Sequence, residues 1–130
     1  MRLFRNAALA LLLAGCGSAS SDHAVSGTVN WTGGDLTGHT VEVASTADAT
    51  VRGFGTIGPG GRFKLERLVN GKVTAGLPPG AYTARLILND EGDGQTKKPK
   101  VPARYLDHKT AGWQVQVPPA GEVALTVAAK

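Results

Sequence analysis

The sequence has 130 residues, a formal net charge of +4 at pH 7 and one cysteine. This length suits a single domain, and a lone cysteine excludes an intrachain disulfide. The 18 glycines and 7 prolines argue against a helical bundle. Because only 5% of the residues are aromatic, valine, leucine and alanine must fill most of the core.

The first fifteen residues have the three parts of a secretory signal peptide. Arg2 and Arg5 make the start basic, residues 7–14 are uninterruptedly apolar, and Gly15 precedes Cys16. A membrane-spanning helix needs about 20 apolar residues, so this run is too short to span a bilayer. We therefore expect cleavage between Gly15 and Cys16, which also removes both arginines.

The segment Leu13-Ala14-Gly15-Cys16 resembles the lipobox of bacterial lipoproteins. In that family a diacylglyceryl group is attached to the cysteine sulfur, the signal is cut off just before the cysteine, and the new amino group usually receives a fatty acyl chain such as palmitate. The resemblance implies that Cys16 is lipidated and anchors the chain to a membrane without spanning it, since two or more acyl chains bind stably. The alternative is a plain secretory signal, which would leave a free thiol in an oxidising compartment.

Residues 16–23 form the predicted lipidated cysteine and flexible tether, ahead of a domain at residues 24–130. Six residues reach at most about 20 Å when extended, so the domain is expected to stay near its membrane. Gly17 stands where aspartate retains many Gram-negative lipoproteins in the inner membrane. The sequence therefore favours the outer membrane of a bacterial cell envelope.

From Ala24 onward, apolar and polar residues alternate with period two between turns rich in glycine and proline. The segments at 50–57 and 62–68 are expected to form one hairpin around a glycine-rich turn. No stretch has a convincing helical period with caps. The pattern predicts an all-β fold, an Ig-like or prealbumin-like β-sandwich. It has about seven strands, within residues 25–31, 40–46, 50–57, 62–68, 82–89, 113–117 and 123–127.

The order of four segments, VSGTV, LTGHTVEV, GFGTIGPGGRFKL and LPPGAYTARL, is similar to that of carboxypeptidase regulatory-like, transthyretin-like domains. The segment from Lys98 onward also resembles the ending of small lipoproteins of this group, which are abundant in planctomycete-like bacteria. Residues 58–61 replace the family's usual turn bearing aspartate. The segment LERLVNGKVTAGL is longer than the usual connection, so the number of strands near Lys72 stays open.

This second resemblance implies a folding, spacing or binding module, so we expect no enzymatic activity and no cofactor. The sequence contains no G-x-S-x-G motif of a serine hydrolase. Charges are mixed in sign apart from the basic run at residues 97–100, so nucleic acid is not an expected partner.

Two patterns suggest metal ligands, but neither predicts a metal site. His39 and Glu42 have the H-x-x-E spacing of zinc carboxypeptidases, but residues three apart on a strand point to opposite faces. We therefore expect polar surface residues there. The segment from Asn89 to Gly94 matches the first positions of a calcium loop, but Lys100 stands where the loop needs a bidentate glutamate. A turn is the expected structure, and weak metal contact there stays open.

Trp31 and Trp113 are the candidate ligand-binding residues, because exposed aromatic rings stack on sugar faces. Each also continues the inward phase of its strand, which favours a position capping the core.

The predicted function is a lipid-anchored, non-catalytic envelope module with a structural or protein-interaction role. Its partners are the membrane, through the lipid anchor, and an envelope protein or glycan. A module that binds carbohydrate or another small ligand is the alternative. An exposed aromatic pair beside a cleft would favour the alternative, and an uncovered strand edge or apolar patch would favour the first function.

Overall fold

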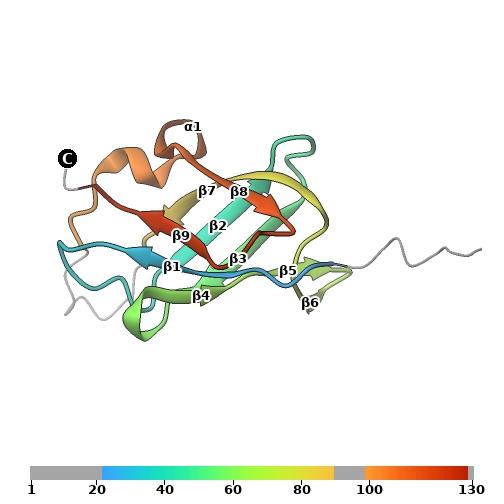
Figure 1. Ribbon diagram of the computed structural model, residues 1–130, viewed down its shortest axis with the longest axis horizontal. Helices are drawn as coiled ribbons and strands as arrows, with labels where there is room; N and C mark the ends of the chain where they lie inside the picture. The colour runs from blue at the N-terminus through green and yellow to red at the C-terminus, as the bar shows by residue number, and fades with distance from the viewer. Residues whose placement is uncertain (1–21, 90–98, 129–130) are drawn as a thin grey trace, which may run out of the picture.

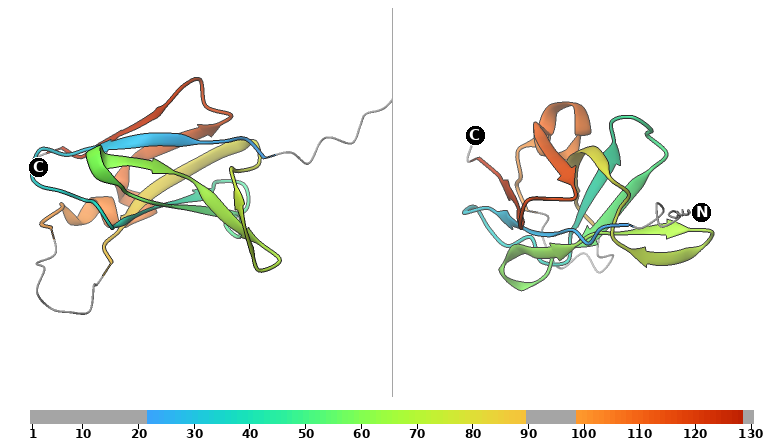
Figure 2. Two further views of the ribbon diagram at one scale, coloured as in Figure 1. Left: turned by 90° about the horizontal axis from the view of Figure 1, so that it is seen from below. Right: turned by 45° about the vertical axis from the view of Figure 1, so that its right-hand side comes forward.

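The computed structural model describes residues 22–89 and 99–128, so the predicted signal peptide, Cys16 and most of the segment from Asn89 to Gly94 lie outside the described residues. Two β-sheets face each other and enclose the core between them (Figures 1 and 2). The predicted all-β sandwich is confirmed. None of the described helices has the length and hydrophobicity needed to cross a bilayer.

The small sheet has the strand order β4-β1-β9. Its central strand β1 (Ser26–Asn30) runs antiparallel to β4 (Arg62–Lys64) and parallel to β9 (Val123–Thr126). Gly27 in β1 faces Phe63 on one side and Val123 on the other. A side chain at this position would collide with the Val123 carbonyl oxygen and the Phe63 ring, so glycine allows the three strands to approach one another.

The large sheet has the order β6-β5-β3-β2-β7-β8, and every neighbouring pair in it is antiparallel. Its longest pairing joins β2 and β7 over six residues, from Thr40–Ile87 to Ser45–Tyr82. The strands of this sheet are β2 (Thr40–Ser45), β3 (Arg52–Thr56), β5 (Glu66–Val69), β6 (Lys72–Ala75), β7 (Gly80–Ile87) and β8 (Trp113–Val117).

The core contains the residues that the period-two pattern places on the inner faces of the strands. Burying such side chains between two sheets is the main source of stability in a sandwich without disulfides. Aliphatic residues supply most of this core, as the low aromatic content predicts. The inward positions confirmed as buried include Val25, Val29, Val41, Val43, Phe63, Leu65, Tyr82, Ala84, Leu86, Val115, Val117, Leu125 and Val127.

The described residues form nine strands, so the prediction of about seven was too low. One cause is that the predicted strand at residues 62–68 divides at Leu65. The first half, β4, joins the small sheet, and the second half, β5, joins the large sheet. Leu65 is buried where the chain crosses, and its amide donates to the Val25 carbonyl. The predicted hairpin with residues 50–57 is therefore only half formed, through the pairing of β5 with β3.

The other cause is the hairpin of β5 and β6, which the long connection near Lys72 left open. A two-residue turn, Asn70-Gly71, joins its strands, and both residues have positive φ, 53° and 81°. Asn-Gly is the strongest local signal for this type of turn. The segment VNGK therefore contained the information for the extra strand β6.

Three short helical segments in the described part of the chain were not predicted. They are η4 (Pro59–Gly61), η5 (Ala103–Leu106) and α1 (His108–Ala111). The Asp107 side chain accepts a hydrogen bond from the Lys109 amide at the start of α1, and Gly112 ends the helix in a left-handed conformation. With one turn, α1 is too short to show a helical period in the sequence. It lies against β7 (Figure 1).

Replacing Gly71 with alanine should lower the free energy of unfolding by about 1 kcal/mol, because a side chain is disfavoured in the left-handed conformation. Urea denaturation of purified protein measures the change. Gly121→Ala is the matched control, since Gly121 has ordinary φ and open space around its Cα. Equal stability of the two variants would contradict the turn geometry.

Candidate functional site

The most concentrated polar cluster of the described residues surrounds Glu42 on β2. Only 4% of Glu42 is exposed. One carboxylate oxygen, Oε1, accepts a hydrogen bond of 2.7 Å from Arg85 Nε and lies 2.9 Å from His108 Nε2. The other oxygen, Oε2, accepts a bond of 3.1 Å from Arg52 Nη1. Three potentially cationic groups therefore converge on one buried carboxylate.

Strand alternation and register build this cluster. Val41 and Val43 point into the core, so Glu42 between them points to the outer face of the large sheet. Arg85 on β7 is the residue directly opposite Glu42. His108 comes from α1, and its Nδ1 lies 3.1 Å from the Thr83 hydroxyl. The cluster therefore joins three strands to α1, which packs against β7.

The charges in this cluster decide the protonation state of Glu42. Burial by itself would raise the pKa of this carboxyl, but hydrogen bonds from Arg85 and His108 outweigh it and hold the pKa below the ordinary value of 4.5. Glu42 is therefore ionised at neutral pH, with its charge balanced by the arginines. This pairing is what makes a buried carboxylate tolerable.

Thr83, His108 and Glu42 form a chain of hydroxyl, imidazole and carboxylate, the connectivity found in hydrolase triads. This chain differs from a triad because Arg85 and Arg52 also bond the same carboxylate and balance its charge. Arg85 also donates a hydrogen bond of 3.1 Å to the Leu106 carbonyl of η5. We therefore interpret the cluster as a cross-link that fixes η5 and α1 to the sheet.

His39 and Glu42 do not form the metal site that their spacing suggests. The expectation that both lie on the surface was wrong, because His39 exposes 8% and Glu42 4%. His39 Nδ1 accepts a hydrogen bond from the Asn89 amide, at 3.0 Å, away from the Glu42 cluster. The Asn89 side-chain amide donates hydrogen bonds to the Gly38 carbonyl and to the Thr40 hydroxyl oxygen. Within residues 22–89 and 99–128, no group of three or more acidic, histidine or cysteine residues is placed to hold a metal ion.

The two tryptophans have different surroundings, although both are partly buried against the core. Trp113 stacks on Tyr105 with ring centroids 4.8 Å apart, and its indole N–H donates to the Thr126 carbonyl of β9. Trp113 thus links β8 to the small sheet. Trp31 instead lines a pocket of about 460 Å³.

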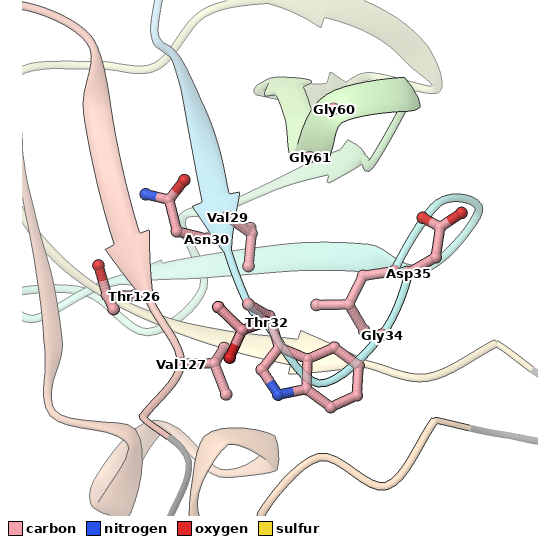
Figure 3. A pocket seen from close by; sticks show the side chains of 11 residues that line it. Val29, Asn30, Thr32, Gly34, Asp35, Gly60, Gly61, Thr126 and Val127 are labelled. Carbon is pink, nitrogen blue, oxygen red and sulfur yellow. The ribbon is translucent and has the colours of Figure 1, made fainter.

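The pocket lies where β1 and β9 end (Figure 3). Gly33 and Gly34 pass so close to the indole of Trp31 that a side chain at Gly33 would collide with it. Asn30 and Asp35 both line the pocket, and Figure 3 shows their side chains on opposite sides of β1. Hydrogen bonds from the hydroxyl and amide of Thr37 lower the pKa of the Asp35 carboxyl. The pocket therefore combines one aromatic ring with an anionic and an amide side chain.

The hairpin of β5 and β6 carries the most exposed large apolar side chains described. Leu68 exposes 63% and Val73 exposes 65%, and the two are directly opposite each other across the hairpin. Within the described residues, β6 pairs only with β5, so its other edge is uncovered. Sequence reasoning missed this surface because it missed the hairpin.

The described chain begins beside this hairpin (Figure 1). The Asp22 carboxylate accepts two hydrogen bonds from Arg67 on β5, at 2.9 and 3.2 Å. His23 next forms a backbone bridge with Leu77. Asp22 and His23 are therefore both bonded to the folded domain.

Comparison of the chain with protein-family profiles, with curated proteins and with solved structures finds no match. Its function must therefore be inferred from its own residues and their geometry.

The variant Glu42→Gln should lower the free energy of unfolding by about 2 kcal/mol at pH 7, because both arginines lose their charged partner. The difference from wild type should shrink in acid. Since the folded pKa of Glu42 lies below 4.5, its stabilisation is present above that pH and is lost as pH falls through the folded pKa. Urea denaturation at a series of pH values measures both effects.

Glu66→Gln provides the control, since Glu66 is an exposed residue on β5 of the same sheet. The Glu66→Gln variant should change the free energy of unfolding little at pH 7 and at pH 2. A Glu42→Gln deficit as large at pH 2 as at pH 7 would contradict the ion-pair account and point to packing alone.

Proposed function

We propose that this chain is a lipid-anchored, non-catalytic module of a bacterial cell envelope, with a structural or protein-interaction role. One observation carries the proposal. The lipobox-like segment ending at Cys16 is followed only six positions later by Asp22, which is paired with the folded domain through Arg67. A tether of that length keeps the domain within about 20 Å of the lipid anchor.

The anchoring chemistry assigns a role to the single cysteine. Attachment of a diacylglyceryl group converts the Cys16 thiol to a thioether, and acylation of the new amino group adds a further chain that holds the protein in the bilayer. Gly17 in place of aspartate favours the outer membrane.

The polar chemistry of the domain supports a non-catalytic role. The Glu42 cluster, its best candidate for acid–base chemistry, is occupied by bonds that join β2, β3, β7 and α1. The uncovered edge of β6 and the exposed side chains of Leu68 and Val73 favour a surface that meets another component of the envelope.

We also propose that the domain is related to carboxypeptidase regulatory-like, transthyretin-like domains. The order of its sequence motifs supports this relationship, and a two-sheet sandwich is the architecture that such domains require. The β5–β6 hairpin and the turn at residues 58–61 are the features by which this chain departs from their usual pattern.

Replacing Cys16 with alanine should release the protein from the membrane fraction when the full chain is produced in a bacterial host, because the acyl chains have no attachment point. Cell fractionation and the mass of the mature N-terminus provide the measurement. Ser18→Ala, in the same tether, should remain membrane-bound and acylated. An unmodified, soluble wild-type chain would refute the anchoring.

Binding of a carbohydrate or another small ligand is the second candidate function, and the Trp31 pocket favours it. Trp31, Asn30 and Asp35 line one pocket and offer a stacking surface and hydrogen-bonding groups for a sugar ring. The Trp113 ring is stacked on Tyr105, so of the two tryptophans this function requires Trp31.

Replacing Trp31 with alanine should abolish retention on a glycan array if the pocket binds sugar, because the ring provides the stacking surface. Phe54→Ala is the control, since Phe54 is 38% exposed on the large sheet and does not line this pocket. Circular dichroism verifies that both variants fold. Equal retention of wild type and the Trp31 variant would exclude this site.

A further inference from the structure

The hairpin of β5 and β6 is amphipathic in a way that suits a bilayer surface. Its exposed cross-strand pair, Leu68 and Val73, is adjacent to a tip formed by Asn70, Gly71 and Lys72. Lys72 makes this tip basic, whereas Arg67 at the base of the hairpin is paired with the Asp22 carboxylate. Apolar side chains beside a basic tip are the combination that binds to the headgroup region of anionic membranes.

The path of the chain brings this hairpin to the membrane. Asp22 is bonded to Arg67, the residue next to Leu68, so the tether enters the domain at the hairpin itself. The distance from Cys16 to Asp22 is at most about 20 Å. The Trp31 pocket, in contrast, lies at the end of β1, at the far end of the domain from β5 and β6 (Figures 1 and 2).

We propose that Leu68, Val73 and Lys72 form a membrane-contact surface that rests on the lipid bilayer next to the anchor. This inference rests on the proposed lipidation of Cys16 and identifies the bilayer as the first partner of the exposed hairpin. The tether keeps the hairpin at a high effective concentration near the lipid, so a weak apolar contact is enough to orient the domain. The Trp31 end then faces away from the membrane, where a protein or glycan can reach it.

Two other occupants of the hairpin are distinguishable. An extended strand from another protein would add to the uncovered edge of β6, and a second copy of this chain would cover the same side chains. Neither explains why the hairpin is the point where the tether joins the domain. When only purified protein and lipid are present, no other protein can cover the hairpin. Coverage of the hairpin by a second copy increases with the protein-to-lipid ratio.

The test uses the full acylated chain carrying Ala75→Cys, purified from host membranes and labelled with an environment-sensitive fluorophore. Acylated Cys16 has no free thiol, so the label attaches only at position 75. Ala75 is exposed, and its Cβ is on the same face as Val73. The labelled protein is reconstituted at low density into liposomes of phosphatidylethanolamine and phosphatidylglycerol. Thr32→Cys, at an exposed position near the pocket, is labelled as the matched control.

The label at position 75 should lose most of its quenching by aqueous iodide and be quenched by nitroxide-labelled lipid, whereas the label at position 32 should behave in the opposite way. Adding Leu68→Ser and Val73→Ser should restore iodide quenching at position 75. Both side chains are largely exposed, so these changes should leave the circular dichroism spectrum unchanged.

Equal iodide quenching at positions 75 and 32 in liposome-bound protein would overturn the membrane contact while leaving the anchor intact. Protection of the label at position 75 from iodide that appears only at high protein density would also overturn the membrane contact, in favour of a second copy. Protein that carries no acyl group and does not float with the liposomes would instead refute the proposed lipidation, so the two failures are distinct.

Discussion

A buried negative charge constrains the outer face of the large sheet. Glu42 lies in the middle of β2, where strand alternation turns it away from the core but α1 covers it. A carboxylate in such a position is stable only if cations or donors surround it. Arg85, Arg52 and His108 meet this requirement, and each comes from a different element. The pairing therefore fixes the position of β3, β7 and α1 relative to β2.

This constraint divides the domain into a cross-linked centre and two ends with different surfaces. At one end, the β5–β6 hairpin extends the sheet beyond the covered region, and its Leu68 and Val73 side chains are exposed. At the other end, Trp31 and the strand ends of β1 and β9 enclose a pocket. Because Asp22 joins the hairpin end, the two ends differ in their distance from any N-terminal anchor. This asymmetry would let the proposed envelope module present one end outward.

Local patterns predicted the sandwich because alternation of apolar and polar residues depends only on neighbouring positions. They failed where one strand serves two sheets, since Leu65 looks like an ordinary inward residue whether the chain continues straight or crosses over. The Asn70-Gly71 turn, in contrast, is a local signal that the sequence itself carries. The cluster around Glu42 was not readable, because Arg85 and His108 are 43 and 66 positions away from it.

The sequence by itself therefore determined the fold class, the inward face of the main strands and the lipobox-like segment, all of which depend on residues adjacent in the chain. Only the tertiary structure decided which residues surround Glu42, that Trp31 and Trp113 have separate surroundings, and that Asp22 joins the domain at the exposed hairpin. These features depend on strand order and register, which place distant residues side by side through packing of the whole chain.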